Sequence, residues 1–196
     1  MLQFFSSLDL SALHGLYAIR TFGGTIAMID VSELSSATTI LGLMCILLVV
    51  LAREKLYAEM TGLFIAVGGS AFALFTLKDL IHRARPDMLY WAYQDGTYSM
   101  PSGHATLVVA FYGFVAYLLC RKIRSRLWRG AIRGATAVVV LAVGFSRLYL
   151  GVHYMSDVLV GYVLGAIFLG VGMLVVRHIP HLVQWEKGGK KTLVEG

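Results

Sequence analysis

Charged side chains are scarce in this sequence. Only 14% of its 196 residues are Asp, Glu, Lys or Arg, whereas soluble domains carry about 25%. Hydrophobic residues make up 58% of the chain. This composition excludes an ordinary soluble domain, and we predict that the chain forms one domain, residues 1–196, inside a lipid bilayer.

Cysteine is nearly absent, and no group of side chains has the spacing of a metal site. Cys45 and Cys120 lie in or at the end of apolar runs, which gives no disulfide framework. No cluster of carboxylates suggests a Mg²⁺ site, and the pair His178 and His181 has no further ligand nearby for zinc. The sequence therefore predicts no metal and no cofactor.

The net charge is +6, and six cations lie between residues 121 and 133, in a polar link between two apolar runs. In a soluble protein such a charge favours nucleic-acid binding. A basic loop between two membrane segments, however, is typical of the cytoplasmic side. We expect the bilayer and a membrane lipid as partners and no nucleic acid, and the sequence identifies no protein partner.

Five apolar stretches are long enough to cross the hydrocarbon core, which takes about 20 residues of helix. By the positive-inside rule, the basic segments 53–55, 121–133 and 177–191 are predicted to be cytoplasmic. Residues 78–104 and 146–157 then share the outer side. The five stretches are 36–52, 60–77, 105–120, 131–150 and 158–176.

The predicted fold is all-α, a polytopic transmembrane helix bundle of five or six spans. Residues 1–34 are predicted to form an amphipathic helix in the outer interface and a link, because Asp9, His14 and Arg20 interrupt the apolar residues there. The alternative for this segment is a sixth span. Residues 35–178 form the transmembrane core, and residues 179–196 form a polar cytoplasmic tail.

Three polar clusters lie on the predicted outer side, and the first is KDLIHRARP, residues 78–86. Lys78 and Arg85 are seven residues apart, which places both cations on one face of a helix that Pro86 ends. They could bind an anion together. Alternatively, they are cations that snorkel from the end of a span.

The second cluster is PSGH, residues 101–104, where the third span begins. Free backbone N–H groups and the helix dipole make such a position favourable for an anion. Gly103 permits close approach to the backbone, and His104 would stand beside the anion. The alternative is an ordinary helix start, with Ser102 as a cap and His104 in water.

The third cluster is SRLYLGVHYMSD, residues 146–157. The guanidinium of Arg147 suits phosphate oxygens. His153 and Asp157 share a face if the stretch is helical, so that Asp157 accepts one ring N–H and leaves the other nitrogen as a nucleophile. The alternative is a surface salt bridge at the boundary of a span.

Together, the clusters would bring three cations, a helix start and two histidines to one side of the membrane. Such a set can perform phosphoryl transfer, because cations neutralise the phosphate, one His attacks phosphorus and the other protonates the leaving oxygen. This chemistry needs no side chains beyond those three clusters.

In order and spacing, the three clusters resemble the signature of the type 2 phosphatidic acid phosphatase (PAP2) superfamily. The matching motifs are Lys78-x₆-Arg85-Pro86, Pro101-Ser102-Gly103-His104 and Ser146-Arg147-x₅-His153-x₃-Asp157. The resemblance implies a metal-independent site in which His153 is the nucleophile, Asp157 orients it and His104 is the acid. It also implies that the phosphate is bound by Lys78, Arg85, Ser102, Gly103 and Arg147.

The resemblance implies an integral membrane lipid phosphate phosphatase with its site on the outer face of the inner (plasma) membrane. Its expected substrates are polyprenyl diphosphates, phosphatidylglycerophosphate or phosphatidate. One alternative is a lipid phosphotransferase that passes the phosphate of the same phosphohistidine to an acceptor lipid. Another is a non-enzymatic membrane scaffold or transporter. Soluble relatives of the site can hold vanadate as haloperoxidases, but the membrane spans argue against that activity.

Overall fold

The computed structural model describes residues 2–93, 96 and 98–191, with side chains from residue 7 to residue 178. Within these residues the chain forms helices, turns and loops, and no strand. In the part of the chain that the structure describes, five helical segments are long and apolar enough to cross a membrane, which confirms the prediction of an all-α transmembrane bundle. These segments are Phe22–Arg53, Tyr57–Ile81, Gly103–Lys122, Arg126–Tyr149 and Met155–His178.

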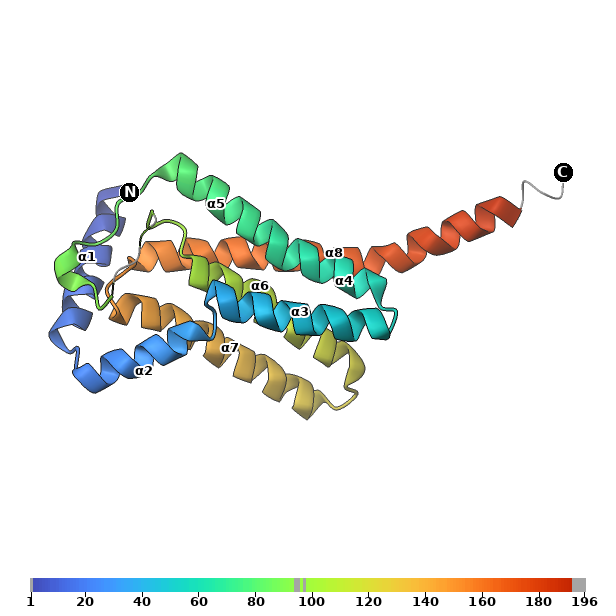
Figure 1. Ribbon diagram of the computed structural model, residues 1–196, viewed down its shortest axis with the longest axis horizontal. Coiled ribbons are helices and arrows are strands. Elements are labelled where there is room, and N and C mark those ends of the chain that lie inside the picture. Colours follow the sequence, from blue (N-terminus) through green and yellow to red (C-terminus); the bar gives the residue numbers. More distant parts are fainter. Residues whose placement is uncertain (1, 94–95, 97, 192–196) are drawn as a thin grey trace.

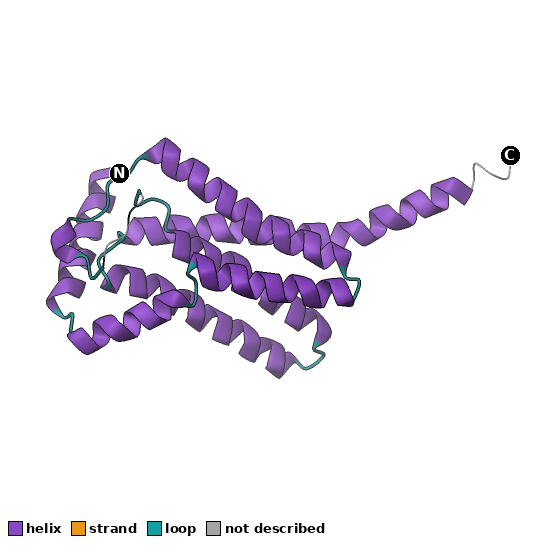
Figure 2. Cartoon of the chain, in the orientation of Figure 1, coloured by secondary structure: helices purple, strands orange, loops and turns teal. Residues whose placement is uncertain are grey.

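The spans run back and forth along one axis (Figure 1). In chain order, the helices that run along this axis are α3 (Ala37–Arg53, the second part of the first segment), α4 with α5 (Tyr57–Phe64 and Ser70–Ile81), α6 (Gly103–Lys122), α7 (Arg126–Tyr149) and α8 (Met155–Lys191). The links between them are loops and turns at the two ends of the bundle (Figure 2). The end where α3, α6 and α8 begin and α5 and α7 finish is called the α1 end, and the other is the opposite end.

The N-terminal segment differs from the expected single helix and link. Two helices, α1 (Leu2–Ala18) and α2 (Phe22–Glu33), occupy it, and α2 takes the residues assigned to the link. Helix α1 crosses the α1 end of the bundle, whereas α2 packs on α7 (Figure 1). Thr21 starts α2, because its side chain accepts a hydrogen bond from Gly24 N (3.1 Å) and its own N–H donates to Tyr149 Oη (3.0 Å).

The core lies between α3, α4, α6 and α8, and glycines allow the last two of these to pack closely. A Cβ at Gly161 would lie 2.7 Å from the carbonyl oxygen of Ser102, and one at Gly165 would lie 2.5 Å from that of Thr106. The start of α8 is therefore held against the start of α6, as the small-residue spacing indicates. This contact places Asp157 beside the first turn of α6.

One turn of the second span is not α-helical. Ile65–Gly69 form a π-helical turn between α4 and α5. A π turn takes one residue more than an α turn. The backbone here lies directly against α8, since a Cβ at Gly69 would lie 2.7 Å from the ring of Phe168.

Helix α8 continues past the predicted end of the fifth span. Its backbone is helical to Lys191, so residues 179–191 of the predicted polar tail extend the same helix beyond the opposite end (Figure 1). Residues 192–196, the rest of that tail, lie outside the described residues.

Candidate active site

The three polar clusters meet in one cavity at the α1 end. The cavity measures about 210 Å³. It is lined by Lys78 and Arg85 from the first cluster, Gly103 and His104 from the second, and His153 from the third. The remaining wall consists of Ser35, Ala37, Leu74, Phe75 and Leu107.

Lys78 reaches the cavity from a helix, whereas Arg85 reaches it from a loop. Lys78 is buried in the last turn of α5, and its Nζ donates to the carbonyl oxygen of Tyr98. The helix ends at Ile81, because His82 takes a left-handed conformation (φ 50°). The expectation that both cations share one helical face is therefore wrong, and Arg85 comes from the loop that follows.

Arg85 joins the first cluster to the third. Its Nη1 donates to the carbonyl oxygen of Val152 (2.8 Å) and lies 3.3 Å from Nε2 of His153. A cation at this distance from a ring nitrogen can hold a phosphate oxygen next to that nitrogen.

Ser102 begins α6 without capping it through its side chain. The residue is fully buried, and its Oγ has no hydrogen-bond partner among the described residues. Its amide donates to the carbonyl oxygen of Asp157 (3.1 Å). Gly103 and His104 are the first two residues of the helix, so unsatisfied N–H groups lie at the cavity wall. These features fit an anion at the helix start better than an ordinary cap.

His153 lies in the turn before α8, and Asp157 lies in the first turn of that helix, so the two do not share a helical face. Gly151 forms this turn at φ +71°, where a Cβ would collide with the carbonyl oxygen of Tyr90. Nδ1 of His153 is 3.5 Å from Oδ2 of Asp157, longer than a normal hydrogen bond, and it has no hydrogen-bond partner among the described residues. The structure thus brings the two side chains together by a turn rather than by helical spacing.

Arg147, in the last turn of α7, adds a positive charge beside the site, although its side chain does not line the cavity. It is fully buried, and its Nη1 donates to Ser32 Oγ (2.7 Å) on α2 and to Tyr93 Oη. Burial lowers the pKa of His153, and the nearby cations Arg147 and Arg85 lower it further, whereas Asp157 opposes them. His153 is therefore neutral near pH 7, the form that can act as a nucleophile.

Sequence analysis gave no role to Arg83, which the structure places on Asp157. Its Nη1 donates to Asp157 Oδ1 (2.6 Å) and to Ser156 Oγ (2.7 Å). Its Nη2 pairs with Asp9 Oδ2 on α1 (2.8 Å). Ser99 Oγ and the amide of Tyr154 donate to the other carboxylate oxygen of Asp157.

Asp9 is the second residue that sequence analysis missed. It is only 2% exposed, and it also accepts hydrogen bonds from the amide (3.0 Å) and the hydroxyl (2.5 Å) of Ser156. A carboxylate in a mostly apolar helix is costly unless it is paired, and this was the available signal. Through Asp9, α1 is attached to the segment that carries Asp157.

A buried neutral histidine and several cations lie in or beside one cavity, with a paired carboxylate next to the histidine, and this arrangement suits a phosphate group. Consistent with this geometry, the family model of the PAP2 superfamily matches residues 59–179. The chain belongs to that superfamily.

Relatives within the superfamily are named as phosphatases. Phosphatidylglycerophosphatase B of Bacillus subtilis is 38% identical over 93 residues, which cover 45% of this chain and 44% of that protein. Lipid A 1-phosphatase of Rhizobium johnstonii is 34% identical over 131 residues, which cover 60% of this chain and 50% of that protein. The chain thus spans about half the length of these curated relatives.

A solved structure shares the fold. The crystal structure of a transmembrane PAP2 type phosphatidylglycerolphosphate phosphatase from Bacillus subtilis matches with a TM-score of 0.78 and 24% identity. The match covers 89% of this chain and 87% of that one. The helix arrangement described above is therefore the arrangement of a known membrane fold.

We expect Asp9→Ala to destabilise the protein. The change leaves Arg83 without one carboxylate and Ser156 without its acceptor, which costs about 2 kcal/mol for buried groups. In a chain of this length, that loss lowers Tm by about 4 to 8 °C. Thermal unfolding of the purified protein in detergent measures it. The control is Asp30→Ala, an exposed carboxylate on α2, and equal Tm values for the two variants would contradict the role of Asp9.

Proposed function

We propose that this chain is an integral membrane lipid phosphate phosphatase that works through a phosphohistidine on His153. The observation that carries the proposal is the position of Nε2 of His153, 3.3 Å from Arg85 Nη1 in a cavity that Lys78 and His104 also line. A phosphate held by the cations would have its phosphorus next to that nitrogen.

In the first step, Nε2 of His153 attacks the phosphorus atom while the bond from phosphorus to the ester oxygen breaks. The carboxylate of Asp157 faces Nδ1 of His153 and so favours the tautomer that carries its proton there. This tautomer leaves Nε2 without a proton and free to attack. Lys78, Arg85 and Arg147 neutralise the phosphate oxygens, with help from Ser102 and the Gly103 amide. His104 gives its proton to the departing oxygen, which leaves as the alcohol or as the lipid phosphate.

In the second step, water replaces the lipid next to His104. His104, now neutral, takes a proton from the water as its oxygen attacks the phosphorus. The bond between nitrogen and phosphorus breaks, inorganic phosphate leaves and His153 returns to its neutral form. The charges of the cations are sufficient for this chemistry without a metal ion.

The shape of the site supports a lipid substrate. Beside the cations, the 210 Å³ cavity is walled by apolar side chains of α5 and α6, among them Leu74 and Leu107. A larger hollow of about 810 Å³ adjoins it and shares Phe75, Lys78 and Arg85. A phosphate can thus sit among the cations while acyl chains stay in the bilayer and a headgroup occupies the hollow. The names of the relatives also support a lipid phosphate as the class of substrate. Within this class we propose polyprenyl diphosphates, phosphatidylglycerophosphate or phosphatidate.

Loop charges support a site on the outer side of the inner (plasma) membrane. The cations of residues 121–133 lie at the end of the bundle opposite the cavity, and such a basic loop is typical of the cytoplasm. Tyr90, Trp91 and Tyr93 lie at the α1 end, and these residue types favour the headgroup level.

We expect the purified protein to release inorganic phosphate from lipid phosphates or diphosphates in excess EDTA, and His153→Ala to abolish the release. The reason is that phosphate charge is met by cationic side chains and that His153 is the proposed nucleophile. A phosphate-release panel over these lipids, with soluble phosphates as controls, measures it.

Two results of that panel would contradict the proposal. One is near-normal turnover by His153→Ala, and the other is activity that EDTA removes and Mg²⁺ restores. Release that depends on an added acceptor lipid would instead identify a phosphotransferase.

His104→Ala should lose least activity on substrates with good leaving groups. An aryl oxide departs without a proton, whereas an alkoxide needs one, and general acid catalysis contributes about 10²- to 10⁴-fold. The measurement is the ratio of kcat/KM for variant and wild type on an aryl and on an alkyl phosphate. Equal losses on both would show that His104 is not the acid.

Sidedness is tested by cysteine accessibility in intact cells. On a background that lacks Cys45 and Cys120, Met88→Cys should react with a membrane-impermeant thiol reagent and Ser125→Cys should not. Met88 is 71% exposed at the α1 end, and Ser125 is exposed in the link between α6 and α7. The reverse pattern would move the site to the cytoplasm.

A further inference from the structure

A basic groove opens between α6, α7 and α8 at the opposite end of the bundle. It holds about 620 Å³, and none of the described residues that line it is acidic. Arginines from all three helices border it, namely Arg121, Arg129, Arg133 and Arg177. We call this the arginine groove.

The groove exists because α6 packs against both α7 and α8, which touch each other little (Figure 1). Toward the α1 end, α7 and α8 are joined by a hydrogen bond, since Tyr162 Oη donates to the carbonyl oxygen of Val140 (2.7 Å). Beyond this bond the lining has small side chains such as Gly113, Ala116 and Ala137. The helices therefore leave an open space on the side of the arginines.

The charges in the groove are only partly met by the protein. Arg121 pairs with Glu59 (3.3 Å). Among the described residues, no carboxylate lies within ion-pairing distance of the other three arginines. Tyr117 lies under Arg121 and Arg177, with guanidinium carbons 5.6 and 6.0 Å from its ring centre. The Oη of Tyr117 is buried and has no hydrogen-bond partner among the described residues.

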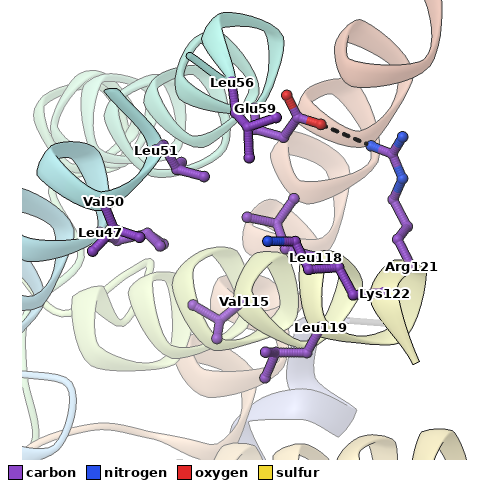
Figure 3. Close-up of a pocket in the computed structure, with 10 residues that line it drawn as sticks. All are labelled: Leu47, Val50, Leu51, Leu56, Glu59, Val115, Leu118, Leu119, Arg121 and Lys122. Carbon is purple, nitrogen blue, oxygen red and sulfur yellow. Dashed lines mark hydrogen bonds and ion pairs between the residues drawn. The ribbon is translucent and has the colours of Figure 1, made fainter. Parts of the chain in front are cut away.

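A second groove on the other side of α6 provides a comparison. It holds about 360 Å³ between α3, α4 and α6 and is lined mainly by aliphatic side chains. Figure 3 shows that Glu59 lies at its rim and pairs with Arg121. In this second groove a carboxylate therefore already neutralises the arginine. No carboxylate is among the described residues that line the arginine groove.

We propose that the arginine groove binds an anionic phospholipid from the leaflet at the opposite end. Basic pockets between membrane helices suit lipid phosphates, and the apolar part of the groove suits the acyl chains of the same lipid. Val109 and Arg121 both line it and are twelve residues apart on α6, roughly 18 Å. That length is close to half of the hydrocarbon core, about 15 Å, so one acyl chain fits along the groove.

This lipid would not be the substrate. His104 and Arg121 are seventeen residues apart on α6, roughly 25 Å, so the two sites face different leaflets. The inference therefore does not depend on the proposed catalytic activity and can be tested by binding alone.

The test compares binding of dioleoyl phosphatidylglycerol and dioleoyl phosphatidylcholine to the purified full chain by native mass spectrometry. We expect the wild type to retain the anionic lipid preferentially. The double variant Arg129→Gln with Arg133→Gln should bind it about thirtyfold more weakly, because each of the two cations contributes about 1 kcal/mol toward an anionic lipid. The matched control is Arg124→Gln with Arg126→Gln, which removes the same charge from exposed positions outside the groove.

A third variant tests the apolar part of the groove. Ala137→Phe fills the space for an acyl chain without changing charge, and Ala137 is exposed, so the larger side chain needs no repacking of the core. It should also lose the bound lipid, and it decides the question if the double arginine variant does not fold. Equal weakening by the groove pair and the control pair, or no preference of the wild type for the anionic lipid, would overturn the proposal.

Discussion

The site depends on a fully buried carboxylate, that of Asp157. A carboxylate in the interior of a membrane protein must be paired and hydrogen-bonded, and the partners of Asp157 come from two separate segments. Arg83 and Ser99 come from the long loop between α5 and α6, and the amide of Tyr154 comes from the turn that carries His153. Satisfying this one charge therefore draws the loops of the α1 end into place around the cavity.

The backbone of the same residue fixes the second half of the site. The carbonyl oxygen of Asp157 accepts from the amide of Ser102, and Gly161 lets α8 approach the carbonyl oxygen of Ser102 at the start of α6. The start of α6, whose N–H groups would bind a phosphate, is thus held at a set distance from His153, which would attack the phosphorus. Preorganisation of this kind is what transition-state stabilisation requires, because the donors need not move during the reaction.

Much of this arrangement could be predicted from the sequence. Hydrophobic length and loop charge predicted five spans and placed the three polar clusters at one end, because both signals are local and physically strong. The groups that line the cavity, such as Lys78, His104 and His153, could be named for the same reason. Helical spacing was a poor guide where a residue lies outside the helix, as Arg85 does after α5 and His153 does before α8.

What could not be predicted were partners distant in the sequence. Asp9 and Arg83 are 74 residues apart, and nothing in either segment indicates that they meet. Residues 1–34 were predicted to form one helix and a link, although Thr21 is an ordinary helix cap and residues 22–33 after it are apolar. Local patterns indicate that a helix can form, whereas contacts between α1, α2 and the bundle follow from packing that only the structure shows.

The π-helical turn at Ile65–Gly69 sets the direction in which the rest of its span faces. Each residue of an α-helix advances the side-chain direction by about 100°, so a turn that absorbs one extra residue resets the phase of everything after it. Lys78 is buried toward the cavity and its neighbour Asp79 is exposed. If these five residues were wound as ordinary α-helix, that phase would change and the ammonium of Lys78 would turn away from the cavity. The two halves of the span can therefore face different directions. Helix α4 presents side chains to the core, and α5 presents side chains to the cavity.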